Sequence, residues 1–368
     1  MDPTHWHAMR GTIMIVNMKA ISFTTETLSI YYESDVTSTP YQKLFENFLY
    51  FRMFSWLAYA LCPASLMFGP WFGFACYSRH VWPSVRMGVS GRSDYTDVLY
   101  LFIGSLIHTS KSFLCALFCL LYSTCLSQVL LPDFALHPWL YAYVTSQSFR
   151  FSHYFVSYAS EAFVTSYGIR FPVEALKPRN SERRSSSSRL TEYIHVTHML
   201  NIEFPRSLAD VVVNWNLPMH SWLKQYVYKP TRPFGHVFSV LATYTTSALL
   251  HGLNFQLSAV LFSIGLFAFV EFLLREKLAY NLSACISSRP CAFDCGHVNR
   301  NAFWVHCCNL FFGFLAAFHL AYLAAAFDTS EQQFHGYSIH HTLRKWSHLG
   351  FLNHFVAFST FVFYKCIS

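Results

Sequence analysis

Charged side chains are scarce in this sequence, and this scarcity is the first indication of its class. Asp, Glu, Lys and Arg make up 12% of the 368 residues, about half of their share in an ordinary soluble domain, whereas 53% of the residues are hydrophobic. Such a composition predicts a chain embedded in the lipid bilayer. The net charge of +7 is modest and is collected in connecting segments, so it does not indicate a nucleic-acid partner.

The apolar stretches are long and continuous. A transmembrane helix needs about 20 such residues, and continuous runs predict helices instead of the alternating strands of a barrel. Nearly uncharged windows cover residues 112–132, 236–255, 256–274, 303–326 and 349–366, and weaker ones lie near 8–31, 48–75 and 139–169. We therefore expect an all-α fold, a multi-pass transmembrane helical bundle of about eight spans or re-entrant elements, in one domain over residues 1–368.

Two common catalytic patterns are missing. The sequence contains neither the Gly-x-Ser-x-Gly turn of serine hydrolases nor a glycine-rich loop that cradles phosphate. A serine hydrolase and a nucleotide-driven pump are therefore poorly supported.

Basic residues predict which segments face the cytosol. They occur in the Ser-rich segment 176–191, which we expect to be a flexible cytosolic loop, at Lys224, Lys229 and Arg232, and at Arg275 and Lys277. If all three groups face the cytosol, the apolar run between Arg232 and Arg275 crosses the bilayer an even number of times. A single helix over that run would be about 58 Å long, too long for a ~30 Å core. The run is therefore predicted to be a two-helix hairpin with its tip near Gly252 and Asn254.

The eleven cysteines do not suggest a disulfide framework, since most lie in or beside apolar segments, where thiols behave as small hydrophobic groups. Cys285, Cys291, Cys295 and His297 resemble a ligand set more closely. Their spacing is irregular, however, and their loop is predicted to face the reducing cytosol. We expect free or lipid-modified thiols there more than a structural metal, which stays the alternative.

One predicted helix carries a polar face. Arg150, His153, Tyr154 and Glu161 follow one another at helical spacing within 148–161. In a membrane bundle this face must turn toward partners or a water-filled cavity. It therefore either lines a substrate path or forms an internal Arg–Glu pair that only fixes packing.

His251 lies in a stretch, residues 237–255, that contains no Asp, Glu, Lys or Arg. An ionisable group at membrane depth is a functional candidate by default, and imidazole can act as a base near neutral pH. Ser247 precedes it by four residues and shares its helix face. The alternative is a histidine that only contributes to packing.

A second candidate group precedes this stretch, in the sequence Asn214-Trp215-Asn216-Leu217-Pro218. Pro218 disfavours helix at Leu217, so a chain break is expected there. An amide beside a break can donate to an oxyanion without titrating. An Asn before a proline is, however, also an ordinary capping signal.

The two groups together resemble the signature of the membrane-bound O-acyltransferases, in which an Asn and an intramembrane His form the catalytic pair. Two segments carry this resemblance: Trp215-Asn216-Leu217-Pro218 and Ser247-Ala-Leu-Leu-His251-Gly. His251 follows Asn216 by 35 residues. Other segments are similar to one branch of that family, the enzymes that lipidate Wnt proteins. These are Trp6–Gly11, Met18–Ala20, Phe68–Trp71, Phe149–Phe155, Phe204–Ser207 and Phe318–Tyr322.

The resemblance implies transfer of a palmitoleoyl group from palmitoleoyl-CoA to a serine hydroxyl of Wnt proteins in the endoplasmic reticulum membrane. Acyl-CoA is a substrate in this reaction, and no cofactor is expected. His251 is then the general base, and Asn216 holds the oxyanion or the thioester. Trp215, Ser247, Arg150, His153 and Tyr154 are expected near the substrates, and Lys229 and Arg232 near the coenzyme phosphates. The resemblance also implies further membrane helices before the segment that begins at Trp6, and we expect this sequence to lack them.

Two other functions fit the same residues. An acyltransferase acting on a lysophospholipid or a sterol would share the Asn–His pair. A non-enzymatic transporter or scaffold would use the buried polar groups as an ion path.

Overall fold

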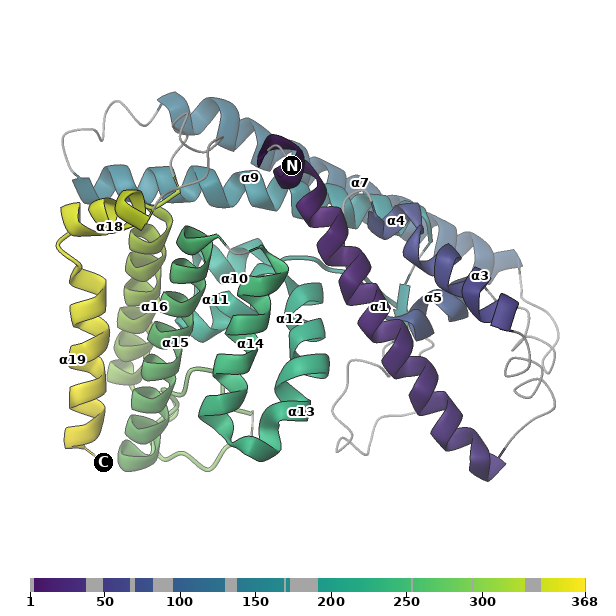
Figure 1. The fold of residues 1–368 in the computed structure, drawn as a ribbon. Helices are drawn as coiled ribbons and strands as arrows, with labels where there is room; N and C mark the ends of the chain where they lie inside the picture. Colours follow the sequence, from purple (N-terminus) through teal and green to yellow (C-terminus); the bar gives the residue numbers. More distant parts are fainter. Residues whose placement is uncertain are drawn as a thin grey trace. The chain divides into compact units, whose positions relative to one another are not determined.

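The computed structural model describes residues 3–37, 49–66, 70–81, 95–129, 138–168, 170–172, 191–252, 254–292, 294–327 and 339–367 (Figure 1). The described chain is almost entirely helical, as predicted. Its longer helices are α1 (Pro3–Thr37), α3 (Leu49–Ala60), α7 (Tyr95–Leu121), α9 (Pro138–Ser166), α14 (His236–Leu250), α15 (Phe255–Leu282), α16 (Phe303–Ala324), α18 (Ile339–His348) and α19 (Leu352–Cys366).

Shorter elements connect these helices. They are α4 (Pro63–Leu66), α5 (Phe74–Val81), α10 (Met199–Glu203), α11 (Leu208–Trp215), α12 (Leu217–Leu223), α13 (Lys229–Thr231), the π-helical turns η1 (Tyr122–Leu126) and η3 (Lys224–Tyr228), and the 3₁₀ turn η4 (Arg232–Phe234). Two strands of three residues, β1 (Arg170–Pro172) and β2 (Thr191–Tyr193), pair antiparallel; the sequence analysis does not predict them. The predicted loop 176–191 lies outside the described residues except for Thr191.

Within the described residues, three helices are long and apolar enough to cross a membrane, namely Phe102–Val129, Phe255–Leu282 and Phe303–Ala324, and the shorter His236–Leu250 is also apolar. Each remaining apolar window of the sequence also forms a helix, in α1, α3, α9 and α19. The chain is thus a membrane helical bundle, and the number of about eight spans stays a prediction.

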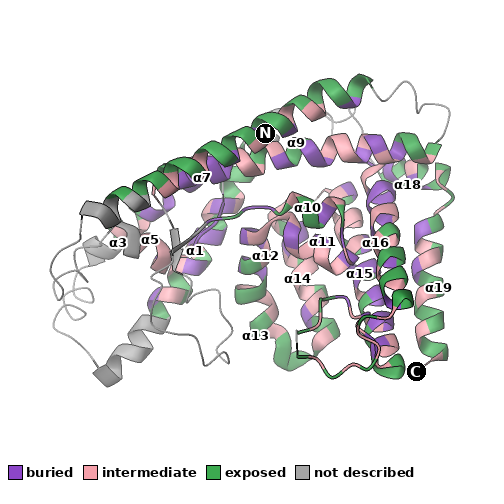
Figure 2. Cartoon of the chain, turned by 180° about the vertical axis from the view of Figure 1, so that it is seen from behind, coloured by how far each residue is buried: buried purple, intermediate pink, exposed green. Residues whose placement is uncertain are grey.

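Large apolar side chains are exposed on many helices. On α7 they include Phe102, Ile107 and Phe113, each at least 60% exposed, and the outer face of this helix is green along most of its length in Figure 2. Contiguous apolar surface of this kind is rare on soluble monomers, and in a bilayer it faces acyl chains. The exposure pattern therefore agrees with a lipid-embedded bundle.

The chain divides into two compact units, with boundaries inside α1, α7 and α9. One contains Met1–Ala8, Leu117–Phe155 and Thr197–Ser368, and the other contains Met9–Ala116 and Val156–Val196. In the second unit, Lys19 is fully buried, and its Nζ donates to the carbonyls of Tyr59 at 2.7 Å and Ala60 at 3.2 Å. A cation on the last carbonyls of α3 satisfies groups that the helix leaves unpaired.

The first unit is built around α15, which packs against α11, α14, α16 and α19. The predicted hairpin is confirmed: α14 and α15 run antiparallel, with the rings of His236 and Phe269 at 5.8 Å. A side chain at Gly265 would meet the Tyr244 ring at 2.7 Å, so the glycine allows the two helices to approach closely.

Arg275 departs from the pattern of loop cations. It is fully buried, where its guanidinium donates to the carbonyls of Arg206, Ile286 and Ser287 and to Asn309 Oδ1, and pairs with Glu271 at 3.1 Å. The ion pair and these hydrogen bonds offset the free-energy cost of burying the positive charge of the guanidinium. Arg275 therefore fixes the end of α15 instead of marking a surface.

Candidate active site

Two antiparallel helical arms of equal length bring Asn216 and His251 to the same end of a hairpin. The first arm is the continuous helix formed by α12, η3 and α13, with 7, 5 and 3 residues, and the second arm is α14, with 15 residues. Between them, η4 and Gly235 reverse the chain. The arms lie side by side (Figure 1), and Tyr228 OH contacts His236 Nδ1 at 2.9 Å. The 35-residue spacing is thus two helices of about 22 Å and a turn.

His251 lies at the end of α14, where the chain turns. It is the C-cap residue, and its N–H donates to Ser247 O at 3.1 Å. Gly252 follows with φ +82°, a conformation that favours glycine directly after a helix. Asn254 then caps α15, since its Oδ1 accepts from Leu257 N at 3.3 Å. These residues place a half-buried imidazole at a break between two apolar helices.

Asn216 lies at the corresponding break in the first arm. Its backbone is non-helical, at φ −148° and ψ 89°, and its Oδ1 accepts from Met219 N at 3.1 Å. The break is therefore at Asn216 and not at Leu217 as expected, because Pro218 is accommodated in the first helical turn. Among the described residues, none accepts a hydrogen bond from Asn216 Nδ2, so this amide group can donate to a substrate.

Asn214 has a different role. It is buried, its Nδ2 donates to Asp210 O and Oδ1, and its Oδ1 accepts from Asn201 at 3.1 Å. Its carbonyl accepts from Thr197 and His198. With its amide oxygen and nitrogen both engaged, Asn214 joins α11 to the preceding segment and is not available to a substrate.

Trp215 connects Asn216 to α9. Its ring lies 5.8 Å from that of His153 and 5.9 Å from that of Tyr154. His153 is exposed, and its Nδ1 contacts Phe149 O at 3.0 Å. Trp215 and His153 therefore remain candidates for a surface next to the reacting groups, as predicted.

Arg150 and Tyr154 have a structural partner that the sequence analysis did not find. Glu203, at the end of α10, accepts from Arg150 Nε at 2.7 Å, from Arg150 Nη2 at 2.9 Å and from Tyr154 OH at 2.8 Å. Both side chains of the ion pair are less than 10% exposed. This geometry supports the packing interpretation for Arg150 and Tyr154, and the role of these residues in substrate binding stays a prediction.

Glu161 does not pair with Arg150. It lies in the other unit, where its carboxylate accepts from Ser112 at 2.8 Å and from Val196 N at 3.2 Å, and where His108 and His195 approach within 3.6 Å. The regular spacing of the polar face suggested one site, but its members contact different segments of the chain.

Ser247 is buried on α14, one turn before His251, and Lys229 and Arg232 are exposed at the turn between the arms. The cations are thus separated from the Asn216–His251 end by the length of an arm, about 22 Å. Such a separation suits a long ligand with an anionic group at one end and its reacting bond at the other.

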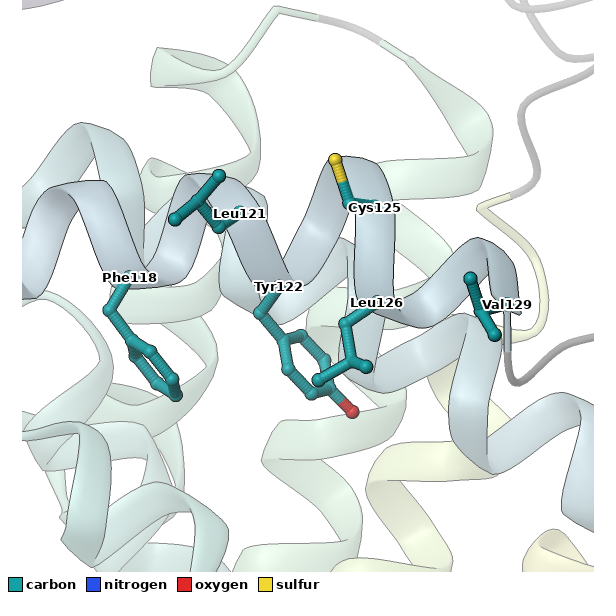
Figure 3. A pocket seen from close by; sticks show the side chains of 6 residues that line it. All are labelled: Phe118, Leu121, Tyr122, Cys125, Leu126 and Val129. Atoms are coloured by element: carbon teal, nitrogen blue, oxygen red, sulfur yellow. The ribbon is translucent and has the colours of Figure 1, made fainter.

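A shallow apolar pocket lies elsewhere, on η1 and the helical residues before and after it (Figure 3). It is lined by Phe118, Leu121, Tyr122, Cys125, Leu126 and Val129. None of the predicted site residues lines it, and all six residues belong to one helical segment.

Comparison with known proteins gives consistent results. The membrane-bound O-acyltransferase family (MBOAT) matches residues 4–282. The human protein-serine O-palmitoleoyltransferase porcupine is 37% identical over all of this chain and 75% of its own length, and its Anopheles gambiae counterpart is 32% identical over all of this chain and 70% of its own. Lysophospholipid acyltransferase 2 of Arabidopsis thaliana is 28% identical over 31% of this chain.

Proposed function

Because this chain belongs to the membrane-bound O-acyltransferase family, we propose that it transfers a palmitoleoyl group from palmitoleoyl-CoA to a serine hydroxyl of Wnt proteins. The names of the relatives that match the whole chain support the acyl group and the serine acceptor. The Wnt acceptor and the endoplasmic reticulum membrane follow from the sequence resemblance. The lysophospholipid alternative has the weaker support of a partial match.

The observation that carries the proposal is the pairing of His251 with Asn216 at one end of two equal arms. His251 offers a base, and Asn216 offers an amide donor that no described residue occupies. Acyl transfer to a hydroxyl needs these two groups, since a proton must be removed and a developing oxyanion stabilised.

The reaction assigns one step to each group. Unprotonated His251 accepts the proton of the serine hydroxyl while the serine oxygen attacks the thioester carbonyl. Asn216 Nδ2 donates a hydrogen bond to the oxyanion of the tetrahedral intermediate. Collapse of this intermediate breaks the carbon–sulfur bond, and the imidazolium returns its proton to the coenzyme A thiolate. The products are the serine ester and coenzyme A.

The proposal is tested with the full chain purified in detergent. Incubation with palmitoleoyl-CoA and a Wnt-derived peptide should add one palmitoleoyl mass to the peptide, and a peptide with Ala in place of the acceptor serine should remain unmodified. Acylation of a lysophospholipid with an unmodified peptide would reject the proposed acceptor and favour the alternative function.

We expect Asn216→Asp to reduce kcat about 10²- to 10³-fold while the protein stays folded. Aspartate keeps an oxygen that accepts from Met219 N and is an equally good helix cap, but it cannot donate to an oxyanion. The measurement is peptide acylation together with the melting temperature.

Asn214→Ala is the matched control for this change. It should lower the melting temperature because it leaves Asn201 and Asp210 without their partner, and it should preserve kcat per folded molecule. If Asn214→Ala reduces kcat more than Asn216→Asp does, the amide role belongs to Asn214.

The exposed cations at the turn are expected to bind the coenzyme. Arg232→Ala combined with Lys229→Ala should raise KM for palmitoleoyl-CoA about 3- to 10-fold and leave kcat unchanged, since contacts to the phosphates are the same in the ground and transition states. Initial rates at varied palmitoleoyl-CoA concentration measure this change. Arg344→Ala, which removes an exposed cation on α18, is the control; an equal KM increase in that variant would indicate a general charge effect.

A further inference from the structure

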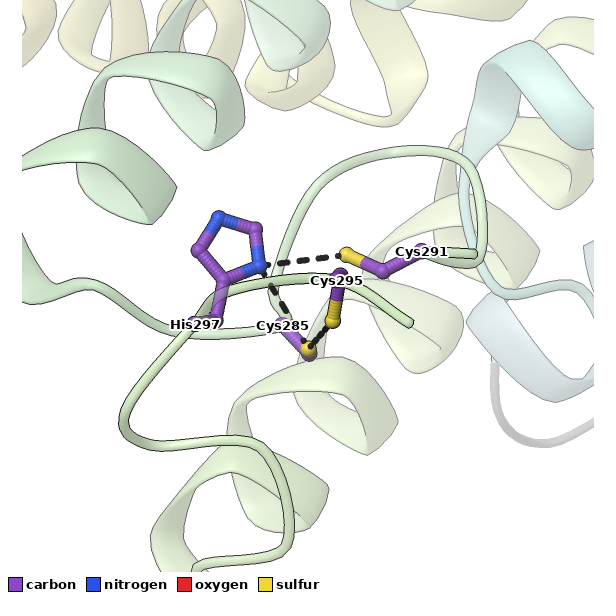
Figure 4. A group of neighbouring side chains, drawn as sticks. All are labelled: Cys285, Cys291, Cys295 and His297. Carbon is purple, nitrogen blue, oxygen red and sulfur yellow. Dashed lines mark hydrogen bonds between the residues drawn. The ribbon is translucent and has the colours of Figure 1, made fainter. Parts of the chain in front are cut away.

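Three thiols and one imidazole converge in the connection between α15 and α16. Figure 4 shows the sulfurs of Cys285 and Cys291 facing the ring of His297, and the sulfur of Cys295 facing that of Cys285. Cys285 Sγ lies 3.4 Å from Cys295 Sγ and 3.5 Å from His297 Nδ1, and Cys291 Sγ lies 3.5 Å from the same nitrogen. All four candidate ligand atoms lie within 4.8 Å of one another.

These distances match the ligand cage of a tetrahedral metal. With metal–sulfur bonds of about 2.3 Å and a metal–nitrogen bond of about 2.0–2.1 Å, tetrahedral angles place sulfur about 3.6 Å from nitrogen and about 3.8 Å from sulfur. A disulfide requires sulfur atoms about 2.05 Å apart, well below the separation of Cys285 and Cys295. The cluster is therefore spaced as a set of ligands and not as a bonded pair.

The backbone at Cys285 is held in place by hydrogen bonds that do not involve the other three residues of the cluster. Cys285 O accepts from Arg206 Nη2 at 2.8 Å and from Asn309 Nδ2 at 3.1 Å, and the next carbonyl, that of Ile286, accepts from buried Arg275 at 2.8 Å. Cys285 is thus held in place by residues from three different segments. The first ligand is preorganised by the bundle.

Cys291, Cys295 and His297 lie in the segment 291–297, whose described residues make few hydrogen bonds to the rest of the chain. Among the described residues of 291–297, the hydrogen bonds that leave the segment are those from Cys295 and His297 to Cys285. Within the segment, Cys295 N donates to Ala292 O at 3.1 Å. Because so few contacts hold this short segment, its conformation needs a further stabilising interaction. A metal ion bound by four side chains supplies that interaction.

We propose that Cys285, Cys291, Cys295 and His297 bind one zinc ion that fastens the connection between α15 and α16. Soft thiolates with one imidazole in a tetrahedron select zinc, and four protein ligands with no open position define a structural site. Binding releases the thiol protons and leaves a net charge of −1 on the cluster, beside the guanidinium of Arg206.

The topology agrees with this choice. Because α14 and α15 are antiparallel, the cluster after α15 lies at the same end of the hairpin as Arg232, the end predicted to face the cytosol. Thiols stay reduced in that compartment, where clustered cysteines bind metal more often than they form disulfides. The irregular spacing of these residues in the sequence favours free thiols, but the fold brings the four side chains together despite that spacing.

The first experiment measures zinc in the full chain, purified through a tag without histidines, in reducing buffer without chelator. Inductively coupled plasma mass spectrometry should find about one zinc ion per chain. Cys291→Ser and Cys295→Ser should each lose nearly all of it, whereas Cys307→Ser, an exposed cysteine outside the cluster, should retain it. Wild-type protein that lacks zinc after growth with added zinc would overturn the proposal.

A second variant separates ligand loss from misfolding. His297→Cys supplies a fourth thiolate and should retain zinc, while its cobalt-substituted form should show a stronger sulfur-to-cobalt charge-transfer band than the wild type. An unchanged cobalt spectrum would exclude His297 as a ligand. A Cys285–Cys295 disulfide, found by peptide mapping of protein purified in the reducing buffer, would exclude the metal site. None of these readouts depends on acyl transfer.

Discussion

Replacing His251 by alanine should reduce the rate of peptide acylation by about 10²- to 10⁴-fold, the range that a general base contributes. In the proposed mechanism the imidazole accepts the proton of the serine hydroxyl, so its loss removes that acceptor. The variant should still be expressed and folded, because the backbone N–H of residue 251, which donates to Ser247 O at the end of α14, is retained. Single-turnover acylation with labelled palmitoleoyl-CoA measures the rate.

The control is His348→Ala, which removes an exposed histidine at the end of α18. It should acylate the peptide at the wild-type rate. Wild-type acylation by His251→Ala would remove the proposed mechanism, whereas normal binding of palmitoleoyl-CoA with no transfer would support it.

The second large effect concerns stability. We expect Glu203→Gln to destabilise the protein by about 3–5 kcal/mol, because it leaves the Arg150 guanidinium charged and buried without its counter-ion. Tyr154 OH and Gln147 Nε2 also donate to this carboxylate, and the glutamine amide offers them one acceptor oxygen instead of two. The measurement is thermal unfolding in detergent micelles, followed by the fluorescence of tryptophan.

Two further variants test the cause of this loss. Glu276→Gln neutralises an exposed carboxylate on α15 and should unfold like the wild type. Arg150→Met combined with Glu203→Gln removes both charges and should recover much of the lost stability, since a neutral pair of similar volume carries no unpaired charge. If the double variant is no more stable than Glu203→Gln, desolvated charge is not the cause.

The fold was predictable where the bilayer constrains it. Continuous apolar windows predicted the helices, and the sign of the flanking charges predicted the turn at Gly252 between α14 and α15. Contacts between distant residues were not predictable in this way. Glu203 lies 53 residues from Arg150, in a segment whose sequence shows only that it is short and interrupted.

The candidate site shows the same division. Residue type and spacing indicated Asn216 and His251, and the helical arms explain how that spacing places both residues at one end of a hairpin. The polar face of α9 was divided between two sets of partners, because helical periodicity shows which residues share a face but not which segment covers it. The side chains of the cysteine cluster likewise come together through a bend that no local sequence pattern describes.

The hairpin of equal arms also limits how this chain can change. Adding one residue to α14 would move His251 by about 1.5 Å along the axis and rotate it by about 100°, out of line with Asn216. Substitutions within the arms leave this alignment intact as long as the helices persist. The two arms are therefore constrained in length even where their side chains are replaced, and insertions that preserve the alignment should lie outside the arms.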